Sequence, residues 1–248
     1  MTRRQYVRPP IQEAMCELRF EGGAEWDLLS AGKLLAILSE EYPAQPKAQL
    51  AGGIEIEQGE EAPSVRWRPG EQRVVFGTLD DSRLVVAGPT SLGVHVLSPY
   101  EGWESFSRRI GRALSAYRAV LDPPDVRRIG VRYVNRILLP GPSADLDDYF
   151  TIGPRSPESL TMTMSNFLIR VEANFKGDPA RVVQTLASSG AEDERAVVVL
   201  DLDVVRDYSD RSLDIDEVAD AIEHLRDLER RCFEAMITER SREMFDAS

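Results

Sequence analysis

The chain of 248 residues, 42% of them hydrophobic, is long enough for one large domain with a substantial core. Its net charge of −12 disfavours general nucleic-acid binding and anionic-membrane binding, because both partners attract a positive field. Two distant cysteines exclude a disulfide framework and a thiolate metal site. We find no signal-peptide pattern and no run long enough for a membrane span, so we expect a soluble, cytoplasmic protein.

The first half of the chain predicts a strand, a helix, an antiparallel meander and a second helix. Residues 11–21 alternate as in a strand, and residues 26–42 carry apolar side chains at helical spacing. A loop is expected over 43–53. Four or five short β-rich runs follow within 54–98, joined by turns rich in Gly, Pro and Asp, which is typical of a meander. An apolar stripe at steps of three and four predicts the helix over 101–120.

The middle of the chain predicts one long strand over residues 126–139, which read V-R-R-I-G-V-R-Y-V-N-R-I-L-L. Prolines on both sides prevent a helix from running through, and the interior is rich in β-branched residues. Because side chains alternate across a strand, one face carries the arginine row, Arg128, Arg132 and Arg136. The other face carries Ile129, Val131, Tyr133, Asn135 and Ile137.

The arginine row has two interpretations. Guanidinium groups repeated along a strand could bind an anionic, nucleotide-like small molecule, with Asn135 as a further ligand-binding candidate. Alternatively, the row forms structural ion pairs with some of the 42 acidic residues. We favour the ion pairs, because arginine is well suited to them.

The second half repeats the order of the first. A Pro-rich loop over 140–160 contains a short helical segment, and strands are expected at 167–175, 181–187 and 195–205. A long helix over 215–245 carries an apolar seam. We therefore predict an α+β fold of two similar halves, 1–125 and 126–248, each strand-helix-antiparallel meander-helix, that form one globular domain over 1–248. Coincidence among common elements is the alternative explanation of the repeat.

Asp201 and Asp203 share one face of an otherwise apolar strand. Paired carboxylates can hold Mg²⁺ in a metal-dependent hydrolase, with Glu172 as the nearest additional ligand. The alternative, which we favour, is that arginines of the central strand pair with them near a sheet edge. We find no phosphate-binding loop, dinucleotide fingerprint, nucleophile elbow or zinc-peptidase motif, so we expect no cofactor and name no catalytic residue.

Four segments carry a resemblance to known proteins. They are P-P-I-Q-E-A at 9–14, R-I-G-V-R-Y-V-N at 128–135, L-D-L-D at 200–203 and F-E-A-M-I-T at 233–238. In this order and spacing they resemble a sporadically distributed bacterial family of uncharacterised proteins of about this length. The resemblance implies no activity, cofactor or catalytic residue, and a scattered distribution is similar to that of mobile or defence-linked genes.

These observations predict a non-enzymatic binding or interaction module. Its expected partner is another protein or a second copy. The apolar seam of the last helix could dock on its own sheet or on a second copy, so a homodimer is a hypothesis. The alternatives are a binder of, or enzyme on, an anionic small molecule at Arg128, Arg132, Arg136 and Asn135, and a metal-dependent hydrolase at Asp201 and Asp203.

Overall fold

The computed structural model describes residues 4–22, 25–50, 53–58, 63–68, 71–123, 125–142, 144–155, 159, 165–208 and 213–247. Its strands are β1 (Ile11–Phe20), β2 (Lys47–Leu50), β3 (Gly53–Gln58), β4 (Pro63–Arg68), β5 (Gln72–Gly77), β6 (Arg83–Ala87), β7 (Ser91–Leu97), β8 (Val126–Leu139), β9 (Leu168–Asn174), β10 (Arg181–Glu192) and β11 (Arg195–Asp207). Its α-helices are α1 (Leu28–Leu38), α2 (Trp103–Leu121), α3 (Val218–Met236) and α4 (Glu239–Asp246), with short 3₁₀ turns at η1 (Leu146–Asp148) and η2 (Ile215–Glu217).

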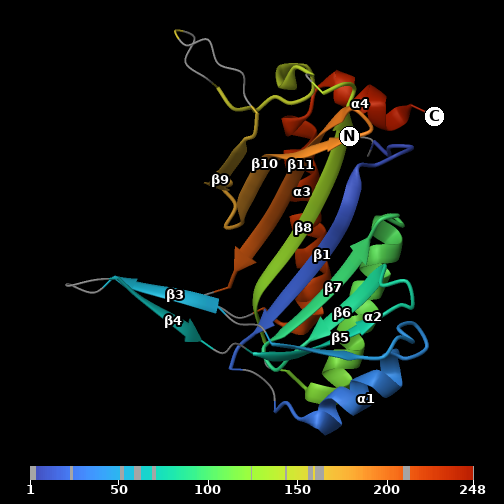
Figure 1. The fold of residues 1–248 in the computed structure, drawn as a ribbon. Helices are drawn as coiled ribbons and strands as arrows, with labels where there is room; N and C mark the ends of the chain where they lie inside the picture. The colour runs from blue at the N-terminus through green and yellow to red at the C-terminus, as the bar shows by residue number, and fades with distance from the viewer. Residues whose placement is uncertain are drawn as a thin grey trace.

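A single nine-stranded antiparallel sheet, in the order β2-β5-β6-β7-β1-β8-β11-β10-β9, dominates the fold (Figure 1). The predicted central strand forms as β8, with the predicted bounds, and pairs with β1 and β11. Its burial alternates as expected. The buried side chains of the apolar face are Ile129, Val131, Tyr133, Asn135 and Ile137.

All the packed helices lie on one face of this sheet, so the sheet has one covered and one open face (Figure 1). α3 packs against β8 and β11, α2 against β7, and α1 against α2 and β5. The predicted apolar seam of α3 is buried; its members include Val218, Ile222, Leu225 and Met236. The seam therefore docks on its own sheet, which is one of the two places expected for it.

The last predicted helix is divided by the structure. Residues 215–217 form η2, and an extended break at Ile237 and Thr238 separates α3 from α4. Ile237 forms a β-bridge with Phe150, and the Thr238 hydroxyl donates to the carbonyl of Asp148 at 2.5 Å. The break lets Phe245 of α4 fold back onto Phe233 of α3, in a second core cluster.

Two predictions in the first half need correction. The segment 43–53 was expected to be a loop, but it contains the edge strand β2, paired with β5. All its side chains are exposed, so it has no alternating apolar pattern to indicate a strand. The meander also divides: β3 and β4 form a separate two-stranded sheet, and β5, β6 and β7 join the main one.

The main sheet is centred on the contact between β1 and β8. On one side, β7 returns to pair with β1; on the other, β11 returns to pair with β8. Together with the four helices this is a mixed α+β fold built on one large antiparallel sheet. None of the described helices is both long enough and apolar enough to span a membrane.

Candidate functional site

The arginine row lies on the open face of the sheet, where carboxylates meet it. Arg132 binds Asp201 through two hydrogen bonds, Nε to Oδ1 at 2.8 Å and Nη2 to Oδ2 at 2.6 Å. Arg136 pairs with Glu192 at 2.5 Å, and Arg128 lies 4.0 Å from a carboxylate oxygen of Asp207. These contacts are those of the ion-pair interpretation.

The two aspartates of β11 differ in their surroundings. Arg132 holds Asp201, while burial raises the pKa of Asp203 above its ordinary value. β11 lies two strands inside the β9 edge, rather than near an edge as expected. Glu172 of β9 forms an ion pair with Arg181 at 3.0 Å. Among the described residues, no three His, Cys, Asp or Glu side chains gather as a metal-binding group.

Asn135 lies on the covered face of the sheet, away from the arginine row. It is buried, and its Nδ2 donates to the carbonyl of Leu200 on β11 at 3.1 Å. The amide therefore joins β8 to β11 on the side where α3 packs. It does not reach the face that carries Arg132.

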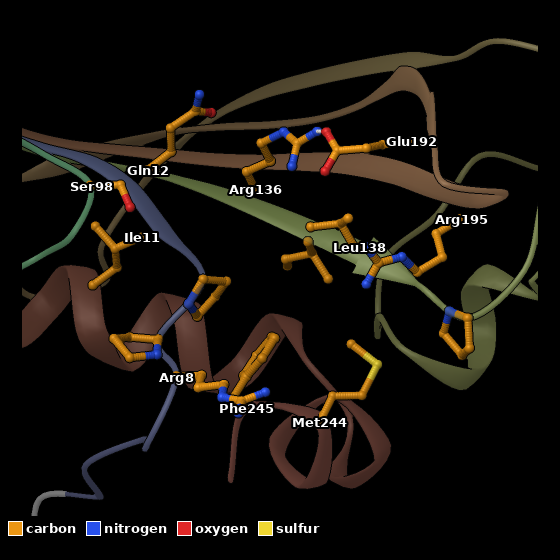
Figure 2. A pocket seen from close by; sticks show the side chains of 14 residues that line it. Arg8, Ile11, Gln12, Ser98, Arg136, Leu138, Glu192, Arg195, Met244 and Phe245 are labelled. Atoms are coloured by element: carbon orange, nitrogen blue, oxygen red, sulfur yellow. Dashed lines mark hydrogen bonds and ion pairs between the residues drawn. The ribbon is translucent and has the colours of Figure 1, made fainter. Parts of the chain in front are cut away.

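A first cavity, called cavity 1, opens where the arginine row ends. It has a volume of about 830 Å³ and lies between β8, the start of β1 and the end of α4. Figure 2 shows Arg136 joined to Glu192 on one side, Arg195 extending toward Leu138, and Arg8 beside Phe245 on the opposite side. The apolar part of the lining includes Ile11, Ile137, Leu138, Met244 and Phe245.

Cavity 1 is basic in a protein of net charge −12. Its lining holds three arginines and one carboxylate, that of Glu192. Arg8 is exposed and makes no side-chain ion pair with the described residues, while its backbone N–H donates to the carbonyl of Phe245 at 2.8 Å. With the described residues Arg195 makes a single long ion pair, 3.6 Å from Asp193. Two of the three guanidinium groups are therefore weakly engaged.

The segment 4–10, the N-terminal strap, separates cavity 1 from a second cavity. Tyr6 donates to Glu234 at 2.8 Å and contacts Phe233 and Phe245 edge-on. Further along, the backbone N–H of Arg136 donates to the carbonyl of Pro10 at 2.8 Å. The strap is thus fixed to α3 and α4 at one end and to β8 at the other. Pro9 and Pro10 line both cavities.

The second cavity, cavity 2, has a volume of about 930 Å³. It lies between the strap, the start of α2, β8 and α3, on the covered side of the sheet. Its aromatic lining consists of Tyr6, Tyr100, Trp103, Tyr133 and Phe233. The hydroxyl groups of Tyr100 and Tyr133 form a hydrogen bond of 2.9 Å. The side of α3 that faces it carries Glu223, Arg226, Asp227, Arg230, Phe233 and Glu234.

A buried ion pair forms one wall of cavity 2. Arg226 hydrogen-bonds Glu229 one turn along α3, and its guanidinium carbon lies 4.3 Å from the ring centroid of Tyr133. The Nε of Arg226 is buried and has no hydrogen-bond partner among the described residues. Burial raises the pKa of Glu229 to about 7. A buried polar group with a strongly raised pKa, beside a cavity, is a feature of functional sites.

Sequence reasoning missed this pair. Arg226 and Glu229 lie in a helix rich in charge, where i, i+3 pairs usually face water. One signal was available: stepping back by threes and fours from Phe233 gives Glu229, Arg226 and Ile222, so both charges adjoin the apolar seam. The two histidines are paired as structural side chains, His95 with Glu13 at 2.8 Å and His224 with Asp178 at 2.6 Å.

Three of the four sequence segments 9–14, 128–135, 200–203 and 233–238 contribute to cavity 2, through Pro9, Tyr133, Asn135 and Phe233. The remaining segment meets them through the bond from Asn135 to Leu200. No protein-family model matches the chain, and a search of curated proteins finds no match.

Proposed function

We propose that the protein is a non-enzymatic binding protein and that cavity 1 holds an anionic ligand with an apolar part. One observation carries the proposal: three guanidinium-bearing residues and one carboxylate surround an apolar floor, in a chain whose net charge is −12. Guanidinium groups bind carboxylates and phosphates through paired hydrogen bonds, and the apolar floor would contact the rest of the molecule.

The anion would bind at one end of the arginine row, beside Arg136, and not along the whole row. Arg132 already binds Asp201 through two hydrogen bonds, so an anion there would have to displace a well-placed partner. Arg136 instead lines cavity 1 together with Arg8 and Arg195. The one carboxylate of the described lining, that of Glu192, is paired with Arg136.

Calorimetric titration at low salt tests this proposal, with octanoate, AMP and inorganic phosphate as probes and octanamide as the uncharged control. We expect octanoate or AMP to bind, octanamide to bind at least tenfold more weakly, and Arg136→Gln and Arg195→Gln each to weaken the anion several-fold. Arg112→Gln on α2 is the matched control, because its side chain is 72% exposed and does not line cavity 1. Equal affinity in all four proteins, or no heat from any anion, contradicts the proposal.

A second candidate function is self-association through the edge strand β9. Among the described strands β9 pairs only with β10, and its side chains Leu168 and Val171 are 70% and 46% exposed. An exposed edge with apolar side chains is a surface on which a second strand can pair. Light scattering across a hundredfold range of concentration tests this: a dimer that is lost in Val171→Lys supports it, and a constant monomer mass excludes it.

We also infer that the halves 1–125 and 126–248 share one plan. In each half a long strand is followed by a meander whose last strand returns to pair with it, and by a 19-residue helix on the covered face. An experimental structure tests this: β1, β5–β7 and α2 should superpose on β8, β9–β11 and α3.

A further inference from the structure

Helix α1 carries apolar side chains on its outer face as well as on the face that packs against the protein. It lies at the periphery of the molecule (Figure 1), and its Leu34 and Leu38 are buried where it meets α2 and β5. On the outside, Leu28, Leu29 and Ile37 are 89%, 71% and 51% exposed. A helix that is apolar all round is usually buried on every side. The outer face of α1 is thus an apolar surface that the described residues leave uncovered.

A single row of side chains runs along this outer face. The row consists of four exposed residues, Leu29, Lys33, Ala36 and Glu40. Their spacing of four, three and four residues places them on one side of a helix, opposite to the buried Leu34. Glu40 continues the row beyond the helix end, because Ser39 keeps a helical backbone with φ −60° and ψ −27°.

The row contains one charge of each sign. Lys33 and Glu40 form no ion pair with the described residues. They are seven residues apart, about 10 Å along the helix, so they are too distant to pair with each other. A two-fold axis midway between them, near Ala36, reverses the row and places Lys33 of each copy opposite Glu40 of the other. The outer face of α1 is therefore complementary in charge to itself.

Small residues keep the middle of this face flat. Gly32 and Ala36 lie between the two charges and the exposed leucines. A Cβ added at Gly32 would meet no atom of the described residues within 4 Å, so packing within the chain does not require a glycine there. Glycine in a helix interior is less stable than alanine, whereas small side chains let two helix axes approach closely.

We propose that the outer face of α1 docks on the same face of a second copy, as an antiparallel pair of helices. The contact covers Leu29 and Ile37, and Lys33 pairs with Glu40 of the other copy twice. A lipid surface fits this face less well, because helices that lie on membranes carry several basic side chains and α1 has one. The contact is separate from cavity 1 and from the β9 edge, and it depends on neither function proposed there.

The experiment is sedimentation equilibrium of the full-length chain over a hundredfold range of concentration. We expect a weak, reversible dimer, because one helix face makes a small interface. Lys33→Glu and Glu40→Lys each place like charges opposite one another and should weaken the dimer at least tenfold. The double variant with both exchanges restores the opposite charges and should bring the dissociation constant back to within threefold of that of the parent. Both side chains are exposed, so the fold should be unaffected.

Matched leucine variants then distinguish α1 from the edge strand. Leu29→Gln should also weaken the dimer at least tenfold. Leu168→Gln should not; it is the control, because this leucine is 70% exposed and lies on β9, at the sheet edge remote from β5. The proposal is overturned by a monomer at every concentration, by a double variant that stays monomeric, or by a dimer that only Leu168→Gln removes. Binding of a monomer to phosphatidylcholine vesicles, lost in Leu29→Gln, would assign the face to lipid and overturn it as well.

Discussion

Two arginine–carboxylate pairs lie on opposite faces of the sheet. On the open face, Arg132 and Asp201 have side chains that are 42% and 15% exposed. On the covered face, Arg226 and Glu229 are 16% and 3% exposed, against the ring of Tyr133. An arginine–carboxylate ion pair thus occurs once on a face that water reaches and once buried on the covered side of the sheet, within α3. The difference teaches that an ion pair has to be judged by its burial, because desolvation decides what each charge costs.

Removing the buried cation should have the largest effect. Arg226→Ala deletes the side chain packed on Tyr133 and Trp103 and leaves Glu229 without its hydrogen bond. Breaking one partner of a buried pair costs about 3–5 kcal/mol, so we expect a loss of that order in the free energy of unfolding. Urea denaturation measures it, with Arg112→Ala as the exposed control. A loss no larger than that of the control would contradict the comparison.

Glu229 should make stability depend on pH in an unusual direction. Its pKa of about 7 in the folded protein exceeds the ordinary 4.5, so the folded state retains a proton that the unfolded chain releases. The contribution of this carboxyl to stability is therefore present below about pH 4.5 and is lost as the pH rises to about 7. Glu229→Gln removes this dependence.

The measurement is the free energy of unfolding of parent and Glu229→Gln between pH 4.5 and 8. We expect the parent to lose up to about 3 kcal/mol relative to the variant across that range. A difference between the two proteins that stays constant with pH would show that Glu229 titrates normally.

The exposed pair should matter much less. Arg132→Gln and Asp201→Asn should each cost about 1 kcal/mol, because water and salt replace part of the interaction. A double-mutant cycle isolates the coupling, which should shrink further in 0.5 M NaCl. A coupling free energy as large as that of the buried pair, or one that does not change with salt, would contradict the difference between the two faces.

Two adjacent residues of β1, Met15 and Cys16, allow the accessibility of the two faces to be compared directly, without a measurement of stability. Cys16 lies on the covered face, fully buried, and burial raises its pKa to about 12. Met15 is half-buried on the open face. A thiol reagent should label Met15→Cys rapidly in the native protein, whereas Cys16 should react only on unfolding. Equal labelling rates would mean that the covered face is accessible.

The sequence predicted the open face better than the covered one. The alternation of β8 gives both faces of the strand and places Arg132 opposite Tyr133. It also favoured arginines of the central strand as partners of Asp201 and Asp203, but it could not say that Arg132 is the partner of Asp201, because the register of two strands depends on tertiary contacts. Cavity 2 could not be predicted from the sequence at all. Its walls come from the strap, α2, β8 and α3, which only the folded chain brings together.

The order in which the sheet can be built follows from its centre. β1 pairs with β7 and β8, so residues 11–20 have no strand partner until residues 91–97 and 126–139 have been synthesised. Nearby hairpins such as β6–β7 and β10–β11 need only short loops, and loop closure grows costlier with separation. The nascent chain must therefore carry an apolar strand, with Ala14, Cys16 and Leu18, unprotected through half of its translation, when chaperones and aggregation compete for it.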